Sequence, residues 1–225
     1  MLAYIVRRLL WTPVLLALAA FFVFVMGTFA PGDPAELRLG NRATPESIER
    51  ERERLGLNDP IPVRYVRYVA NVLQGDFGDS YHYQGRPVLE IITPRLWVSV
   101  QLNIAALIVA ILIGLPLGFY AAKKQGTASD PAIVISMLIL YAMPVFFTAP
   151  FLILFFAVKL HWVPAAGWGG FFSPQIVLPA LTIGIPGAAI FVRHMRASTL
   201  EVVGQEYVRT AHAKGMSNFV VNYRH

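Results

Sequence analysis

Four long runs of uncharged, mostly apolar residues constrain this chain more than any other feature. A helix needs about 20 such residues to cross the roughly 30 Å hydrocarbon core of a bilayer. The runs are 22, 27, 28 and 22 residues long and cover residues 9–30, 96–122, 131–158 and 171–192. They lack the alternation of barrel strands, and only helices or closed barrels satisfy their backbone in lipid. The runs therefore predict an all-α integral membrane protein with four transmembrane helices.

The composition excludes several other classes of protein. Charged residues make up 14% of the 225 residues, whereas soluble domains carry about 25%. The chain has no cysteine, and its five histidines show no metal-ligand spacing. It contains neither a phosphate-binding loop nor a nucleophile elbow. We therefore expect no catalytic residue, no metal site, no cofactor and no nucleic-acid partner in this chain.

Basic residues near the ends of the runs predict the topology. Cytoplasmic flanks are enriched in Lys and Arg, and here the flanking basic residues are Arg7, Arg8, Lys123, Lys124, Arg193 and Arg196. Residues 31–95 hold nine Arg and ten Asp or Glu, so we expect this nearly neutral segment outside and both chain ends inside. The first run is longer than the apolar core of a signal peptide, about 7–15 residues, which predicts a retained anchor.

The outer segment, residues 31–95, contains helix signals. Thr44 as N-cap before Pro45 predicts a helix that ends at Gly56, with ion pairs Glu46–Arg50 and Glu49–Arg52 along it. A second helix over 62–74 carries an apolar stripe, and its tyrosines, Tyr65 and Tyr68, favour packing against the membrane domain. The predicted organisation is an anchor helix (1–30), an outer helical segment (31–95), a core of three spans (96–200) and a cytoplasmic loop (201–225).

The spans contain polar groups and helix breakers but no Asp, Glu, Lys or Arg. That absence argues against an ion-driven carrier. Glycines and prolines in the last three spans are either ordinary membrane-helix composition or kinks around a pathway. The candidate residues lining a pathway are Gln101, Asn103, Tyr141, Met143 and Thr148.

The tail after residue 200 predicts a short helix over 205–214. Glu206 lies near its start, Lys214 at its end and Gly215 at the C-cap position. Ser217 or Asn218 is placed to cap a further helix toward His225. This segment is either an amphipathic helix on anionic lipid or a knob that docks into a partner groove. Its few basic residues are interleaved with acids, which favours the knob.

At this point the chain resembles a known family, the permease subunits of ATP-binding-cassette (ABC) importers of the dipeptide, oligopeptide and nickel branch. The matching motifs run over the whole chain in order. They are Tyr4-Ile5-Val6-Arg7-Arg8-Leu9, Pro31-Gly32-Asp33-Pro34, Gly75-Asp76-Phe77-Gly78, Met143-Pro144-Val145-Phe146, Leu178-Pro179-Ala180 and Glu206-Tyr207-Val208-Arg209-Thr210-Ala211-His212-Ala213-Lys214-Gly215. The last motif resembles the family's cytoplasmic coupling loop, often called the EAA loop, with Glu206, Arg209, Thr210, Ala211, Lys214 and Gly215 as its candidate contact residues.

The resemblance implies a solute pathway in a prokaryotic inner membrane, coupled to ATP hydrolysis elsewhere. Its implied partners are membrane lipid, a second permease, two ATPase subunits that bind ATP and Mg²⁺, and an extracytoplasmic solute-binding protein. Di- or oligopeptides are the first expected solutes, followed by nickel, glutathione or sugars. Family permeases have six spans, so the chain as given ends within the coupling loop. A secondary carrier or channel subunit and a truncated fragment without transport are the alternatives.

Overall fold

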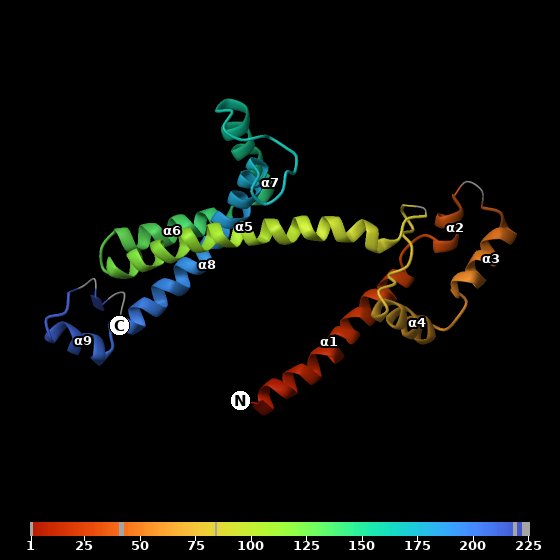
Figure 1. Cartoon of the computed structure of the whole chain (residues 1–225), viewed down its shortest axis with the longest axis horizontal. Coiled ribbons are helices and arrows are strands. Elements are labelled where there is room, and N and C mark those ends of the chain that lie inside the picture. Colours follow the sequence, from red (N-terminus) through yellow and green to blue (C-terminus); the bar gives the residue numbers. More distant parts are fainter. Residues whose placement is uncertain (1, 41–42, 84, 218–219, 222–225) are drawn as a thin grey trace. The chain divides into compact units, whose positions relative to one another are not determined.

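The structure is a computed structural model that describes residues 2–40, 43–83, 85–217 and 220–221, most of which are helical (Figure 1). The chain forms two compact units, Met1–Arg95 and Leu96–His225. Tyr4–Thr28, Val88–Lys123 and Pro174–Val203 are long and apolar enough to cross a membrane, and the bent pair Ser129–Ala142 and Val145–Lys159 makes a fourth crossing if it is one span. The predicted all-α membrane fold class is confirmed.

The first unit contains helices α1 (Leu2–Thr28), α2 (Pro34–Leu39), α3 (Pro45–Leu55) and α4 (Ile61–Leu73). Helix α3 begins and ends as predicted. Thr44 Oγ1 accepts a hydrogen bond from the Ser47 amide at 3.3 Å, and the Thr44 amide donates to Ser47 Oγ at 2.8 Å. Gly56 ends the helix in the left-handed conformation (φ 64°), which is strained for residues with a Cβ. Both ends of α3 are therefore set by local sequence.

Two tyrosines attach α4 to α1. The hydroxyl of Tyr65 donates a 2.5 Å hydrogen bond to the carbonyl of Ala17. Its ring meets Phe21 edge-on with centroids 5.1 Å apart, and the Tyr68 ring lies 5.5 Å from Phe24. Such aromatic pairs add to area burial, so α4 packs against α1, which is one of the helices able to cross a membrane.

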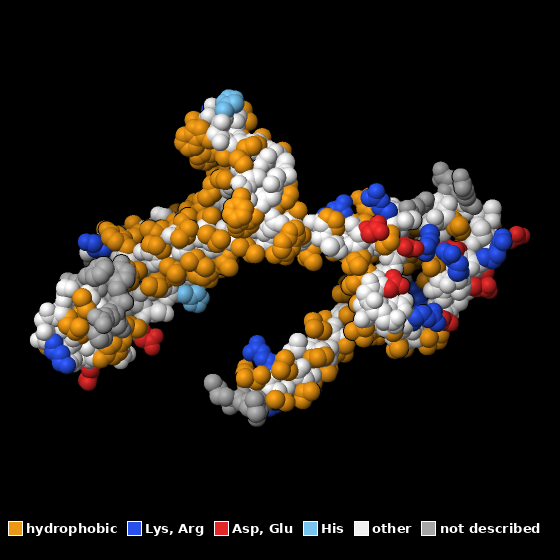
Figure 2. All heavy atoms as spheres, viewed as in Figure 1, with side chains coloured by type: hydrophobic (Ala, Val, Ile, Leu, Met, Phe, Trp, Pro, Cys, Tyr) orange, Lys and Arg blue, Asp and Glu red, His pale blue; other side chains and the backbone are white. Residues whose placement is uncertain are grey.

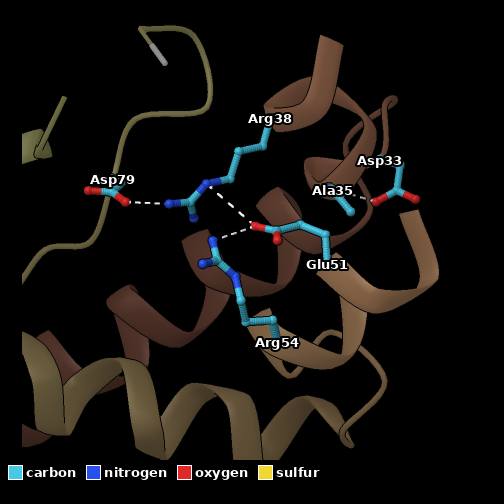
Figure 3. A network of polar contacts seen from close by, with 6 residues as sticks. All are labelled: Asp33, Ala35, Arg38, Glu51, Arg54 and Asp79. Atoms are coloured by element: carbon cyan, nitrogen blue, oxygen red, sulfur yellow. Dashed lines mark hydrogen bonds and ion pairs between the residues drawn. The ribbon is translucent and has the colours of Figure 1, made fainter. Parts of the chain in front are cut away.

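Charged side chains connect α2, α3 and the segment after α4 (Figure 3). Arg38 reaches Asp79 at 2.5 Å and Glu51 at 3.5 Å, and Arg54 also contacts Glu51 at 2.7 Å. Arg52 pairs with Asp33 at 2.7 Å, and this hydrogen bond raises the pKa of the Arg52 guanidinium above its ordinary value. Helices α2 and α3 and the segment after α4 are thus held together largely by polar contacts.

Of the two ion pairs predicted along α3, one forms. Arg52 lies 3.7 Å from Glu49, which confirms the predicted pair Glu49–Arg52. Arg50 instead donates from Nε to the main-chain carbonyl of Glu46 at 3.3 Å, so the predicted ion pair between these side chains is wrong. The Arg50 side chain thus bonds to the main chain of its own helix, one turn earlier.

The second unit is built on close contact between α5 (Val88–Lys123), which begins before the boundary, and α8 (Val177–Val203). The buried residues of α5 are all small. Five of them are four residues apart, namely Ala106, Ala110, Gly114, Gly118 and Ala122, and Ala121 is buried beside the last. A Cβ on Gly118 would lie 2.6 Å from the carbonyl oxygen of Val192, and one on Gly184 of α8 would lie 2.6 Å from that of Ala106. Small residues thus allow the two backbones to touch, as in other membrane helix pairs.

The third predicted span is not one continuous helix. Helix α6 (Ser129–Ala142) ends at Met143, and the following helices α7 (Val145–Leu152) and η2 (Ile153–Lys159, a π-helix) are bent from it by 98°. Met143 is extended (φ −72°, ψ 123°) because the ring of Pro144 disfavours the α conformation for the residue before it. The expectation of an unbroken helix over 131–158 is therefore wrong, because the chain bends at Pro144, while a role of this kink around a pathway stays a prediction.

The other helix boundaries also differ from the apolar runs. Helix α5 starts eight residues before position 96, and α8 continues past position 192 to Val203. At the start of the fourth run, η3 (Pro174–Ile176) precedes α8, so residues 171–173 lie outside the helix. Hydrophobic side chains cover much of the visible face of α5, α6 and α7, while Lys, Arg, Asp and Glu gather over α2 and α3 (Figure 2).

Candidate functional site

The segment after α8 folds around its own small apolar cluster. Helix α9 (Glu206–Ala213) confirms the helix predicted over 205–214. Val208, Ala211 and Val221 are buried together, and Met216 packs against them. Because residues i and i+3 share one face of a helix, Val208 and Ala211 of α9 point into this cluster. The segment after α8 is therefore a folded knob within the described residues.

A glycine turn closes α9. Gly215 has φ 78°, and the amide of Met216 donates to the carbonyl of Ala211 at 3.2 Å. This bond, together with the contact of Met216 with the cluster, forms a Schellman motif. Ser217 Oγ then accepts from the Val220 amide at 3.4 Å, which fits the predicted cap of a second helix. Val220 and Val221 are helical, while Asn218 and His225 lie outside the described residues.

The predicted coupling residues divide into two groups. Ala211 is 6% exposed and belongs to the internal cluster. The others are exposed and available to a partner: Glu206, Arg209, Thr210, Lys214 and Gly215. Thr210 also bonds the carbonyl of Glu206 through its hydroxyl at 2.9 Å. Both acidic and basic groups thus lie on the outer face of the knob, as expected for docking to a protein surface rather than to anionic lipid.

The sequence reasoning missed an ion pair that joins α6 to α8, close along the chain to this knob. Arg196 donates from Nε to Asp130 Oδ1 at 2.5 Å and from Nη2 to Oδ2 at 2.6 Å. The Asp130 side chain is 8% exposed and the Arg196 side chain 30%. Asp130 is in the first turn of α6, where a carboxylate also interacts favourably with the helix dipole. An acid at the start of the third run and a base after the fourth were the available signals.

The predicted pathway residues do not gather around one site. The amide of Asn103 donates to the carbonyl of Ser99 at 2.8 Å, and the hydroxyl of Thr148 lies 3.4 Å from the carbonyl of Val145, so both bond within their own helices. Tyr141 is 52% exposed. Met143 is the extended residue at the break, and Gln101 is half-buried on α5. Their role as pathway residues stays a prediction.

A cavity of about 250 Å³ lies between α7, η2, the loop at 164–167 and α8. Its walls are mainly apolar, from Val145, Ala149, Ile153, Leu178 and other residues, with Gln175 and Thr182 as polar members. Gln175 Oε1 is buried without a hydrogen-bond partner among the described residues. None of the five predicted pathway residues lines this cavity. Nor do the described residues include a group of three or more His, Cys, Asp or Glu able to hold a metal ion.

Comparison with known proteins assigns the family. Residues 114–225 match the family described as "Binding-protein-dependent transport system inner membrane component", and residues 1–103 match "Binding-prot-dependent transport system membrane comp, N-term". The chain belongs to this family and is a multi-pass inner membrane protein. The resemblance on which the sequence interpretation relied is confirmed.

Several curated relatives cover almost the whole chain. The "Probable peptide ABC transporter permease protein y4tP" of Sinorhizobium fredii is 37% identical over 228 residues, which is 99% of this chain and 72% of the relative. The "Oligopeptide transport system permease protein AppB" of Bacillus subtilis is 34% identical over 100% of this chain and 74% of its own length. The "Glutathione transport system permease protein GsiC" of Salmonella paratyphi A is 36% identical over 100% of this chain and 72% of its own length.

Proposed function

We propose that this chain is the permease subunit of an ABC importer for di- or oligopeptides. The peptide solute is supported by the relatives, whose names specify peptide, oligopeptide and glutathione transport. The spans form part of the solute pathway, and the outer segment, residues 31–95, faces the extracytoplasmic side. The flanks with Arg7, Lys123 and Arg196 face the cytoplasm, in accord with the positive-inside rule.

The folded knob after α8 is the observation that carries the coupling role. A segment that had only to lie on lipid would need no internal cluster. Here Val208, Ala211 and Val221 are buried within the knob itself, which leaves Glu206, Arg209 and Lys214 exposed. A rigid helix with charged outer residues suits insertion into a groove of a partner protein. We assign the groove to a cytosolic ATPase subunit.

The proposed assembly divides the work among subunits. Two ATPase subunits bind ATP and Mg²⁺ and hydrolyse the nucleotide, while a second permease completes the pathway and an extracytoplasmic binding protein delivers the solute. This chain itself supplies no catalytic group. Support comes from the family description, which specifies binding-protein-dependent transport, and from the absence of a phosphate-binding loop in the sequence.

The substitution Gly215→Val in the assembled transporter tests this function. Gly215 has φ 78° and open space around its Cβ position, so valine would strain only the backbone of the turn. The turn would then open and displace the segment after it. We expect ATPase subunits to co-purify with the permease at about a tenth of the normal yield, which corresponds to a loss of about 1.4 kcal/mol of docking free energy, and solute uptake to fall in parallel.

Gly75→Val is the matched control, since Gly75 also has a positive φ (84°) and open space around its Cβ position but ends helix α4. It should leave ATPase binding at the normal level. Wild-type uptake by Gly215→Val at normal membrane levels would refute the coupling role. Uptake that continues in vesicles without any ATPase subunit would instead identify a secondary carrier or channel.

A further inference from the structure

Asp130 and Arg196 form the one ion pair between α6 and α8 among the described residues. It is bidentate, with both donor–acceptor distances between 2.5 and 2.6 Å, and its carboxylate is almost fully covered. The remaining residues of α6 are uncharged. Apolar contacts tolerate sliding and rotation, whereas a two-point bond between a guanidinium and a carboxylate fixes position and angle. The pair therefore sets the register of α6 against α8.

The two helices joined by this pair are followed along the chain by different elements. Helix α8 continues from Arg196 to Val203 and, after Gly204 and Gln205, enters α9. Helix α6 leads in the other direction to the extended residue Met143 and, past a 98° bend, to α7. Helix α7 forms part of the wall of the 250 Å³ cavity. Arg196 is thus placed on the element that carries the knob, and Asp130 on the element that ends at the break.

We propose that Asp130 and Arg196 are positioning residues that make α6 follow α8 when the coupling loop moves. This inference rests on the proposed function of the knob. With α6 bonded to α8 at its first turn and ended by the extended residue Met143, movement of the knob end of α8 is passed to the bend between α6 and α7. Without the pair, α8 would move and α6 would lag behind, so ATP hydrolysis would continue while the pathway failed to change shape.

A double-mutant cycle in the assembled transporter tests this link. The variants are Asp130→Asn, Arg196→Gln and the two together, reconstituted in proteoliposomes with all partner subunits. Three quantities are measured: the amount of ATPase subunit bound, the rate of ATP hydrolysis, and the number of solute molecules imported per ATP. Arg193→Gln is the matched control because Arg193 lies on the same helix, one turn earlier, and is exposed.

We expect normal ATPase binding in each variant and a fall of about tenfold in solute imported per ATP, within the usual range of coupling between sites. The double variant should be no worse than either single one, because one shared interaction is lost in all three. It also avoids leaving one buried charge unpaired, the condition under which a single variant is most prone to misfold. Arg193→Gln should import solute at the wild-type ratio.

The link is refuted if the double variant imports solute at the wild-type ratio, or if its loss equals the product of the two single losses. It is also refuted if Arg193→Gln lowers the ratio as much as Arg196→Gln. A purely structural role would lower membrane level and ATPase binding instead of the ratio. Should Gly215→Val leave transport unchanged, the proposed function fails; should it abolish transport while Asp130→Asn keeps the normal ratio, the link alone fails.

Discussion

Residues 1–95 hold helices α2 and α3 together with charged side chains at the surface, whereas residues 96–225 rely on small residues that bring backbones into contact. In the first unit, Arg38 and Arg52 reach across between elements and remain 26% and 43% exposed. In the second, Gly118 and Gly184 leave no room for a Cβ against the facing helix. The charged contacts are screened by water and salt, while the close packing depends on shape alone.

The two units should therefore differ in how well they tolerate amino-acid substitutions. An exposed ion pair contributes little to stability, so its loss is absorbed. A glycine in a helix contact has no alternative, since any larger side chain must push two main chains apart. Segments held by exposed ion pairs can therefore vary in sequence, whereas the packed helices of a transport pathway must keep their small residues to keep their spacing.

Gly118→Val should produce the largest effect. Its new Cβ would lie 2.6 Å from the Val192 carbonyl oxygen and 2.8 Å from Met195 Cβ, and neither atom is at the end of a flexible side chain. Overpacking of this kind costs about 1–3 kcal/mol or more. We expect a clear fall in the thermal unfolding temperature of the detergent-purified protein and reduced levels in the membrane.

Gly27→Val provides the comparison within the first unit. Gly27 also lies in a helix, α1, but nothing is within 4 Å of its Cβ position. The two substitutions are chemically identical, so they differ only in what surrounds the glycine. Equal losses for both would show that valine in a membrane helix, rather than the contact between α5 and α8, is responsible.

Asp33→Ala should have an intermediate effect, because Asp33 performs two tasks. Its Oδ1 accepts from the Ala35 amide at 2.9 Å as the N-cap of α2, and its Oδ2 accepts from Arg52 of α3 at 2.8 Å. Loss of an N-cap costs about 0.5–2 kcal/mol. We expect faster amide hydrogen exchange throughout α2, measured by mass spectrometry on the purified protein.

Asp33→Asn separates the two tasks, since asparagine caps helices as well as aspartate does but carries no charge. It should leave exchange in α2 close to normal and change only the contact with Arg52. If Asn behaved like Ala, the ion pair rather than the cap would stabilise α2, and the surface charges of the first unit would matter more than their exposure indicates.

The features that sequence predicted best were those encoded within a few residues. Thr44, Gly56 and Gly215 each fix a helix end by a contact with neighbours in the chain. Such helix ends can therefore be predicted from the sequence without knowledge of the fold. The apolar runs likewise located the membrane helices. The break at Pro144 also had a local cause, yet the same run contained Pro150, and α7 continues through that residue.

Contacts between distant residues were not predictable in the same way. Asp130 and Arg196 are 66 positions apart. Each could be explained by itself as a charged residue at a membrane edge, so nothing in the sequence indicated that they pair. The small residues of α5 do recur every fourth position, from Ala106 to Ala122, but such a stripe does not identify the helix that it meets. Only the packed structure shows that α8 is that partner. The roles of the candidate coupling and pathway residues stay predictions.

Arg67→Gln should have the smallest effect of the three tests. Arg67 Nη2 lies 2.7 Å from Asp59 Oδ2, but the two side chains are 51% and 40% exposed. Water solvates both charges in either state, and ordering two long side chains offsets part of their attraction, so exposed pairs contribute about 0–1 kcal/mol. We expect an unfolding temperature within a degree or two of wild type, about what a few tenths of a kcal/mol produces, and less difference still at high salt, where screening weakens the pair. A loss that approached that of Gly118→Val would mean that the first unit depends on its surface charges as strictly as the second depends on its small residues, and the contrast between the two units would fail.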